Sequence, residues 1–363
     1  MNVRDTEVIC GLLKSAGYEI CTNEEEAEVI IFNTCSVRQH AEDRVWSLIG
    51  SYKGSKIIGL VGCMAQNYKE YAFERDANIS FVVGPQDIHK LPEILDKLKP
   101  AGLFKRKVWE VDSIMRPDEI YHHGFYSDKT HAYVVISEGC SNFCSYCVVP
   151  YVRGPLRHRE SKNILDEVEN AIACGLTKIT LLGQNVNAYR DNKINFSGLL
   201  ERINQLTGLK ELGFFTSHPK DVDRDFFQVI KDSKRIAKSL HLPLQSGSDR
   251  MLKLMQRGYT QKEYLALIDS YRKIVKGGLL TTDIIVGFPS ETEQDFRQTY
   301  NLLEKVKFNA AYIFKYSPRP HTEAAKMVDM LTKVEKEKRH KIILDLQKSI
   351  SKKVRKKFGH AKN

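Results

Sequence analysis

Short apolar runs rich in isoleucine and valine alternate with helical patterns along almost the whole chain. Three such runs lie in the first hundred residues, at 28–35, 56–63 and 79–84. Runs of this length and composition are typical of parallel strands that are buried on both faces. We therefore expect a three-layer α/β domain over residues 1–100, with helices at about 5–16, 37–50, 65–75 and 88–98.

A second alternating series follows a polar, irregular stretch that we interpret as a linker over residues 101–130. Its strands are expected at 132–138, 178–183, 211–216, 238–243, 280–286 and 310–315, each followed by a helical pattern. Six βα units in one direction predict a partial (β/α)6 barrel over residues 131–331, and chemistry in such barrels gathers at the carboxyl ends of the strands. Residues 332–363 are expected to form a basic C-terminal helix.

Basic residues outnumber acidic ones, and the net charge of the 363-residue chain is +11. Such a surplus favours a polyanionic partner, because lysine and arginine release counterions from phosphates, although a solvated basic surface is the alternative. No apolar run reaches the roughly 18 residues of a membrane span. Residues 1–5 also lack an apolar signal core. We therefore expect a cytoplasmic protein without a membrane partner.

Cys140, Cys144 and Cys147 lie within eight residues, directly after the first expected barrel strand. In a reducing compartment, clustered cysteines suggest a metal or catalysis and not disulfides. Three thiolates on a [4Fe–4S] cube leave one iron open, as is typical of a catalytic metal site, and that iron could chelate S-adenosylmethionine (SAM). Structural zinc is the alternative, but no fourth cysteine or histidine lies at finger spacing.

The C-x3-C-x2-C spacing on a (β/α) barrel resembles the radical SAM superfamily. The resemblance implies that a reduced cluster cleaves SAM to a 5′-deoxyadenosyl radical, while the protein places the reactants and excludes water. It also implies that Tyr146 packs near the adenine, where the alternative is an ordinary core aromatic. Polar residues at the ends of the expected barrel strands are candidate SAM contacts: Gln184, Asn185, Ser217, Gln245 and Asp283.

Cys35 and Cys63 each stand where an expected parallel strand of the N-terminal domain ends. Ligands bind outside the carboxyl ends of such strands, so two cysteines at neighbouring ends could share a metal. Taken singly, each would more often be a small core residue. We interpret the isolated Cys10, Cys21 and Cys174 as structural.

Several segments carry a wider resemblance: NTCSVR at 33–38, GCMAQ at 62–66, EGCSNFCSYCVVPYVRG at 138–154, LLGQNVNAY at 181–189, FTSHP at 215–219, HLPLQSGSD at 241–249, DIIVGFPSET at 283–292 and YSPRP at 316–320. Together they closely resemble the methylthiotransferases, and within them the tRNA-2-methylthio-N6-dimethylallyladenosine synthases (MiaB type). The resemblance implies conversion of N6-(dimethylallyl)adenosine beside the tRNA anticodon to its 2-methylthio derivative. It also implies a second [4Fe–4S] cluster for the sulfur, held by three cysteines of which two map to Cys35 and Cys63.

The chain departs from this family at both ends. The third auxiliary cysteine would stand two residues before Met1, so the chain is truncated, its start is misassigned or the auxiliary cluster is incomplete. The family's RNA-binding TRAM domain is expected to be absent after Asn363. Contacts to tRNA would then fall to a basic loop and the basic helix: Arg153, Arg157, His158, Arg159, Lys352, Lys353, Arg355, Lys356 and Lys357.

The main prediction is a tRNA methylthiotransferase that works as a monomer, uses SAM and two [4Fe–4S] clusters, and takes electrons from a flavodoxin or ferredoxin. One alternative is a related methylthiotransferase that acts on threonylcarbamoyl-adenosine tRNA or on a ribosomal protein. Another is an inactive tRNA-binding iron–sulfur protein.

Overall fold

The computed structural model describes residues 1–36, 39–52, 56–98, 107–113 and 115–358. The chain folds into two compact units. The first comprises Met1–Ser141 and Val148–Thr177, and the second comprises Asn142–Cys147 and Lys178–Asn363. The three-cysteine loop therefore contributes Cys140 to the first unit and Cys144 and Cys147 to the second.

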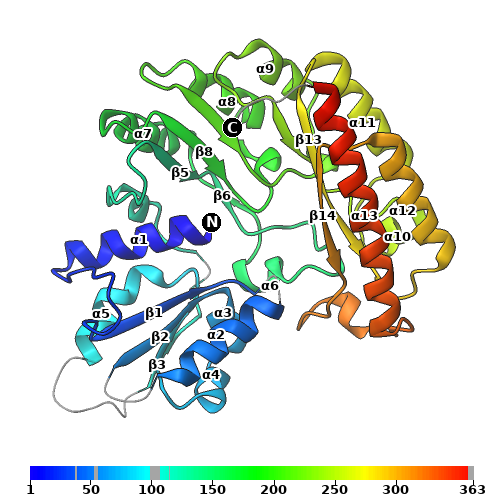
Figure 1. Ribbon diagram of the computed structural model, residues 1–363. Helices are drawn as coiled ribbons and strands as arrows, with labels where there is room; N and C mark the ends of the chain where they lie inside the picture. The colour runs from blue at the N-terminus through cyan, green and yellow to red at the C-terminus, as the bar shows by residue number, and fades with distance from the viewer. Residues whose placement is uncertain (37–38, 53–55, 99–106, 114, 359–363) are drawn as a thin grey trace. The chain divides into compact units, whose positions relative to one another are not determined.

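A parallel sheet organises the N-terminal part of the first unit. Its strands are, in order across the sheet, β1 (Val29–Thr34), β2 (Ile57–Gly62), β3 (Ile79–Val83) and β4 (Val108–Glu110). The expected strands at 28–35, 56–63 and 79–84 are confirmed, and β2 and β3 are buried almost throughout. The helices of this part are α1 (Asn2–Ser15), α2 (Gln39–Ser51), α3 (Cys63–Tyr68), α4 (Tyr71–Arg75) and α5 (Leu91–Leu98). Figure 1 shows α1 and α5 on one side of the sheet and α2, α3 and α4 on the other, which makes the three expected layers.

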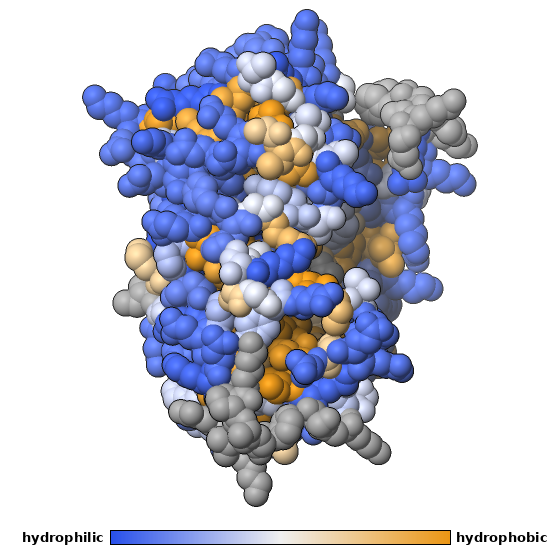
Figure 2. Space-filling view, turned by 90° about the vertical axis from the view of Figure 1, so that its left-hand side faces the viewer, coloured by the Kyte–Doolittle hydropathy of each residue, from blue (hydrophilic) through white to orange (hydrophobic). Residues whose placement is uncertain are grey.

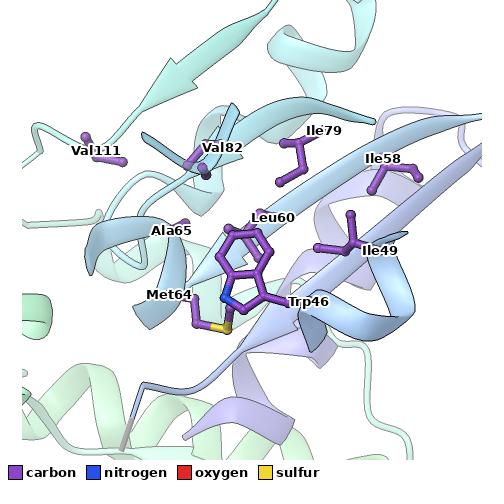
Figure 3. Packing of buried hydrophobic residues seen from close by; sticks show 10 residues of the cluster. Trp46, Ile49, Ile58, Leu60, Met64, Ala65, Ile79, Val82 and Val111 are labelled. Carbon is purple, nitrogen blue, oxygen red and sulfur yellow. The ribbon is translucent and has the colours of Figure 1, made fainter. Parts of the chain in front are cut away.

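The core between the sheet and α2 is built around Trp46 (Figure 3). Its indole lies beside Leu60 of β2 and Met64 of α3, which are both fully buried. The guanidinium carbon of Arg75 also lies over this ring, 4.7 Å from its centroid. Burial of a side chain as large as Leu or Met stabilises a fold by about 1.5–3 kcal/mol. Because Met64 directly follows Cys63, this packing also fixes where Cys63 lies.

The segment interpreted as a linker contains regular structure, which is a correction to the sequence analysis. Within it, β4 pairs in parallel with β3, and Val82 lies opposite Trp109. A short 3-10 helix follows at Asp118–His122. The strand was missed because it has only three residues and none of them is buried, so it makes no apolar run. The boundary expected at residue 100 therefore falls before the last strand of the N-terminal sheet.

The rest of the first unit surrounds the start of the three-cysteine loop. It consists of β5 (His131–Val135), β6 (Ser137–Glu138), α6 (Val149–Arg153), β7 (Arg157–His158) and α7 (Ser161–Ala173). The two short strands β6 and β7 pair in antiparallel fashion. This hairpin and α6 were not anticipated, because strands of two residues and helices of five leave no periodic pattern to detect.

The second unit is an arc of parallel strands with helices between them: β8 (Lys178–Leu182), β11 (Glu211–Phe214), β12 (Ser239–His241), β13 (Leu279–Val286) and β14 (Ala310–Lys315). Parallel ladders join β8 to β11, β12 to β13 and β13 to β14. A bridge between Leu212 and Ile236 continues the arc from β11 towards β12. The expected barrel strands of this unit are confirmed, and a short hairpin of β9 (Arg190–Asp191) and β10 (Ile194–Asn195) is added.

The helices of the arc are α8 (Phe196–Asn204), α9 (Phe226–Asp232), α10 (Asp249–Leu254), α11 (Gln261–Ile274) and α12 (Glu293–Val306). Capping boxes fix two of their starts, because Thr260 and Glu263 cap α11 while Thr292 and Asp295 cap α12.

The basic C-terminal helix is α13 (Lys333–Phe358), which runs beside β14 and α12 in Figure 1. It packs through Ile343 and Ile350, and the Gln347 amide donates to the Phe308 carbonyl at 3.0 Å. Hydrophilic side chains predominate on the face drawn in Figure 2, with apolar ones surfacing between them. Among the described residues, no helix combines the length and the hydropathy that a membrane crossing requires.

Candidate cluster and cofactor site

The three-cysteine loop begins where two backbone segments approach so closely that only glycine fits between them. Gly139 has φ 71°, and a Cβ atom there would collide with the carbonyl oxygens of Gly154 and Pro155. The next residue uses this close approach, because the Cys140 amide donates to the Gly154 carbonyl at 3.1 Å. The position of Cys140 in the first unit is thus set by the backbone.

Ser145 attaches the second half of the loop to the second unit. Its amide donates to the Met255 carbonyl at 3.1 Å, and its hydroxyl donates to the Leu254 carbonyl at 2.8 Å. These carbonyls end α10, where the last turn of a helix lacks intrahelical partners. The Ser145 carbonyl in turn accepts from the Ala324 amide at 2.7 Å. Cys144 and Cys147, on either side, are held by this attachment.

A buried arginine contacts the cysteine at position 144. Arg257 Nη1 lies 3.2 Å from Cys144 Sγ and 3.3 Å from the Tyr146 hydroxyl oxygen. Its other nitrogens donate to the Pro243 carbonyl at 2.9 Å and to the Tyr259 hydroxyl at 3.0 Å. The guanidinium therefore places a positive charge and an N–H donor beside the Cys144 sulfur. Arg257 was not expected as a site residue, because nothing in the neighbouring sequence distinguishes it from the other basic residues of the chain.

Tyr146 packs against an apolar cluster that includes Met251, Met255 and Phe288. Burial raises the pKa of its phenol, so the hydroxyl stays protonated near neutral pH. The geometry matches the core role that the sequence analysis gave as the alternative for this residue. Its role beside the adenine stays a prediction.

The cysteines of the loop have the chemistry of an iron–sulfur ligand set. All three are free of disulfides; Cys144 is buried, and Cys140 and Cys147 are half-buried. Within the described ranges, no three Cys, His, Asp or Glu side chains converge on a single metal ion. A cubane cluster binds each cysteine through a different iron, so its ligands stand apart. An all-thiol donor set with a cation beside it therefore fits a cluster better than a lone ion.

Buried oxygens without partners mark the carboxyl ends of β8, β11 and β12. Within the described part of the chain, four of them have no hydrogen-bond donor: Gln184 Oε1, Asn185 Oδ1, Ser217 Oγ and Gln245 Oε1. Leaving such an atom unsatisfied costs about 1–3 kcal/mol. A polar ligand with donor groups would remove that cost, and SAM, with an amino group and ribose hydroxyls, has this chemistry. The structure thus brings these four candidates to strand ends within one unit.

Two residues at these strand ends have unusual backbone conformations. Thr216 has φ 71° and Gln245 has φ 73°, a region that a β-branched residue such as threonine rarely adopts. Such a conformation costs on the order of 1–3 kcal/mol and persists only when its surroundings enforce it. Here the Thr216 carbonyl accepts from the Val186 amide at 2.9 Å, and the Gln245 amide donates to the Asp283 carbonyl at 2.8 Å. Strain held in this way is typical of binding sites.

The position expected for Asp283 is wrong. The residue lies in the middle of β13, which runs on to Val286, and not at the strand end. Its carboxylate faces His241, with Asp283 Oδ2 3.3 Å from His241 Nε2. The strand expected at 280–286 already runs past Asp283, so placing this residue at a strand end did not follow from the predicted strand. A contact between Asp283 and SAM stays a prediction.

His218 is a further candidate site residue, which was not expected from the sequence although it stands beside Ser217 in the same motif. Its ring is buried, and Nδ1 accepts from the Lys220 amide at 3.3 Å. Burial, with Arg257 nearby, lowers the pKa of His218 to about 2, so the ring is neutral. Its Nε2 atom has no partner among the described residues, and this tautomer makes Nε2 a donor.

Cys35 and Cys63 follow neighbouring strands, as expected. Thr34 of β1 lies opposite Gly62 of β2, and a Cβ atom on Gly62 would lie 2.7 Å from the Thr34 carbonyl oxygen. The two strand ends therefore approach closely. Cys63 is buried while Cys35 is exposed. Whether they bind a metal stays a prediction.

Two arginines of the basic loop, Arg153 and Arg159, are buried inside the first unit, which corrects the prediction that their side chains contact RNA; contacts through Arg157 and His158 stay a prediction. Arg153 and Arg159 are buried and pair with Asp5 and Glu167, respectively, each at 2.6 Å. Arg157 pairs with both Asp118 and Glu138. Arginines clustered in a polar stretch look solvated in a sequence, because their acidic partners come from distant segments.

The residues of α13 predicted to contact RNA differ from Arg153 and Arg159 in their exposure. Lys352, Lys353 and Arg355 are exposed. The side chains of Lys356 and Lys357 lie outside the described residues. Three of the five predicted positions on this helix are therefore accessible to a binding partner.

Comparison with known proteins adds to this geometry. Residues 134–303 match the Radical SAM superfamily, and residues 1–84 match the Uncharacterized protein family UPF0004. The tRNA-2-methylthio-N(6)-dimethylallyladenosine synthase of Moorella thermoacetica is 41% identical over 362 residues, which are 97% of this chain and 81% of that protein. The protein of the same name from Thermoanaerobacter pseudethanolicus is 40% identical over 363 residues, which are 97% of this chain and 76% of that protein.

Solved structures share the fold. The radical S-adenosylmethionine methyltransferase TsrM from Kitasatospora setae superposes with a TM-score of 0.61 at 16% identity, covering 88% of this chain and 73% of that chain. The cobalamin-dependent S-adenosylmethionine radical enzyme OxsB gives a TM-score of 0.51 at 15% identity, covering 96% of this chain and 50% of that chain. At such identities the likeness concerns the fold alone.

Proposed function

This chain belongs to the tRNA-2-methylthio-N6-dimethylallyladenosine synthase family, and from that premise we propose that it converts N6-(dimethylallyl)adenosine next to the tRNA anticodon to its 2-methylthio derivative. The observation that carries the proposal is the 41% identity to a synthase over 97% of the chain. The match of residues 134–303 to the radical SAM superfamily supports the same chemistry.

The radical-forming half of the reaction needs a [4Fe–4S] cluster and SAM, for which this chain has fitting residues. Cys140, Cys144 and Cys147 would hold the cluster. When bound, the cluster and SAM supply a 5′-deoxyadenosyl radical that removes hydrogen from the base. Tyr146, Gln184, Asn185, Ser217, Gln245 and Asp283 are the proposed SAM contacts. The buried, unpartnered oxygens of four of these residues support this assignment.

The sulfur half is proposed to use a second cluster bound through Cys35 and Cys63. The close approach of the ends of β1 and β2 supports a shared site, because it brings the two residues that precede these cysteines together. Arg153 Nε lies 3.4 Å from Cys63 Sγ, so a positive charge stands beside the sulfur that is proposed to bind this cluster.

Two partners follow from the proposal. The substrate is tRNA, which the net charge of +11 and the exposed Lys352, Lys353 and Arg355 would favour. A flavodoxin or ferredoxin would deliver the electrons, one at a time. We propose that the chain acts as a monomer in the cytoplasm.

The test is an anaerobic reaction of the reconstituted protein with SAM, reductant and tRNA that carries dimethylallyladenosine. Mass spectrometry of the digested nucleosides should show the 2-methylthio derivative, and 5′-deoxyadenosine should accumulate. A Cys144→Ala protein is the control and should make neither product. If the parent chain forms 5′-deoxyadenosine with a ribosomal protein substrate and leaves tRNA unchanged, the tRNA assignment is wrong.

A further inference from the structure

We infer that Arg257 is a positioning residue for the radical-forming cluster: its guanidinium orients the Cys144 sulfur towards iron and raises the reduction potential of the cluster held there. The inference rests on the proposed function, which supplies the cluster. It concerns a residue that no motif of the sequence analysis singled out.

Two hydrogen bonds hold the guanidinium of Arg257 in place. Nε donates to the Tyr259 hydroxyl at 3.0 Å, and Nη2 donates to the Pro243 carbonyl at 2.9 Å. The Tyr259 hydroxyl is itself fixed, because it donates to the backbone that follows β12. A guanidinium is planar, so two anchored nitrogens determine where the third one points. That third nitrogen, Nη1, lies 3.2 Å from Cys144 Sγ.

The charge of Arg257 also lacks the carboxylate partner that other buried arginines of this chain, such as Arg4 and Arg116, have. Arg4 pairs with Glu167 at 2.8 Å and Arg116 pairs with Asp5 at 2.9 Å, all four side chains being buried. Within the described part of the chain, Arg257 forms no ion pair with a carboxylate, although only 4% of it is exposed. A buried cation without a counter-charge is costly.

The counter-charge that fits this position is the thiolate-bound cluster. One electron from a reductant makes such a cluster more negative by one charge, with no bond formed or broken in the protein. A fixed cation and an N–H donor at the ligating sulfur stabilise the reduced form more than the oxidised form. Hydrogen bonds to cluster sulfurs and local charge are established determinants of reduction potential.

Ser145 provides a control within the same loop. Its hydroxyl donates to the Leu254 carbonyl, so it holds the loop without touching a cysteine sulfur. A Ser145→Ala change removes this one hydrogen bond, keeps the backbone bonds of residue 145 to Met255 and Ala324 that hold the loop, and leaves the charge beside Cys144 unchanged. Any effect specific to Arg257 should be absent from this variant.

The experiment uses Arg257→Met, Arg257→Lys and Ser145→Ala in a Cys35→Ala/Cys63→Ala background, so that only the barrel cluster is observed. After anaerobic reconstitution, iron content and an EPR-monitored redox titration with dithionite are measured. We expect a more negative midpoint potential in Arg257→Met, a smaller shift in Arg257→Lys, which keeps the charge, and no shift in Ser145→Ala. A fully loaded Arg257→Met protein with the parent's potential would overturn the inference.

An Arg257→Met protein that binds no cluster also tests the positioning role. If Arg257→Met binds no iron while its apo form unfolds as cooperatively as the parent, the positioning role is supported. If its apo form does not fold, Arg257→Lys decides: reduced iron content or a shifted potential supports the role, and normal values of both overturn it. A parent chain that binds no cluster refutes the proposed function, whereas a loaded parent with an indifferent Arg257 refutes only this inference.

Discussion

Arg153 Nε lies 3.4 Å from the sulfur of Cys63, which is the first residue of α3. The same guanidinium pairs with Asp5 of α1 at 2.6 Å, and Asp5 pairs with Arg116 at 2.9 Å. Cys63 is therefore connected to an ion-pair network inside the first unit. This network gives that cysteine an environment unlike that of a simple core residue.

Asp5 should carry a large part of the stability of the first unit. Burial alone would raise the pKa of its carboxyl, but Arg153 and Arg116 lower it from 3.8 to about 2. Because the pKa is lower in the folded state, the stabilisation is present above pH 4 and is lost as the pH falls towards 2. Asp5→Asn should reduce the free energy of unfolding by about 2 kcal/mol at pH 7, and the difference from the parent should shrink between pH 4 and 2.

Urea unfolding at pH 7, 4 and 3 measures this difference. Asp232→Asn is the matched control, because Asp232 is exposed and its nearest cation, Lys231, lies at 3.9 Å. Its change should stay within about 0.5 kcal/mol at each pH. Equal effects of the two substitutions at pH 7 would contradict the role given to Asp5.

Gly139→Ala should disturb the three-cysteine loop far more than an ordinary glycine substitution does. A Cβ atom at Gly139 meets the backbone of Gly154 and Pro155, which cannot move aside as a flexible side chain can. Gly175 is the control, because its φ of 89° is also positive but nothing lies within 4 Å of its Cβ position. Gly175→Ala should cost about 1–2 kcal/mol of stability and still bind iron normally. Gly139→Ala should lose more stability and most of its cluster, as iron analysis would show; normal iron content would refute this.

Much of the fold could be predicted from the sequence because its strands are apolar on both faces. The expected strand at 310–315 coincides with β14, and the helical pattern expected after the strand at 280–286 is α12, which begins at its capping box. Patterns of this kind are local. The three-residue β4 has no such pattern, because its place in the sheet comes from pairing with β3.

Some residues of the candidate site could likewise be predicted from the local sequence, and others could not. The cysteines and the polar strand ends could be found from spacing alone. Arg257 and His218 could not, because their importance lies in what surrounds them: a thiol 113 residues away in one case and burial without a partner in the other. The same reason explains the error at Arg153, whose partner Asp5 is 148 residues away.

Ser217→Ala should separate ligand binding from stability. The Ser217 hydroxyl is buried and has no partner among the described residues, so its removal should leave the apo protein unchanged or stabilise it by up to about 1 kcal/mol. SAM affinity, measured by calorimetry, should fall about tenfold, since a lost hydrogen bond is worth about 1.4 kcal/mol.

Ser233→Ala is the contrasting substitution. Ser233 is equally buried, but its hydroxyl donates to Asn204 at 2.6 Å and accepts from the Ile236 amide at 3.0 Å. We expect this variant to lose about 1–3 kcal/mol of stability and to bind SAM as the parent does. If both variants lose stability alike and neither loses affinity, Ser217 is not a SAM contact.

The basic face of α13 should account for much of the affinity for tRNA. Changing the exposed Lys352, Lys353 and Arg355 to Gln removes three charges without touching the packed face that contains Ile343 and Ile350. The slope of log affinity against log salt should become shallower by about 2–3, because about one counterion is released per phosphate contact. Filter binding at several salt concentrations measures both the affinity and the slope.

The control removes the same charge from another place on the amino edge of the parallel strands, the edge where α13 also ends, since the Ser351 hydroxyl donates to the Asn309 carbonyl just before β14. Lys231, Lys234 and Lys238 are exposed and precede β12, so they lie at its amino end, away from the candidate SAM contacts. Their replacement by Gln should change the salt slope little. If both triple variants weaken binding equally, total charge explains the affinity and α13 has no special role; if only the α13 variant does, this helix is part of the tRNA-binding surface.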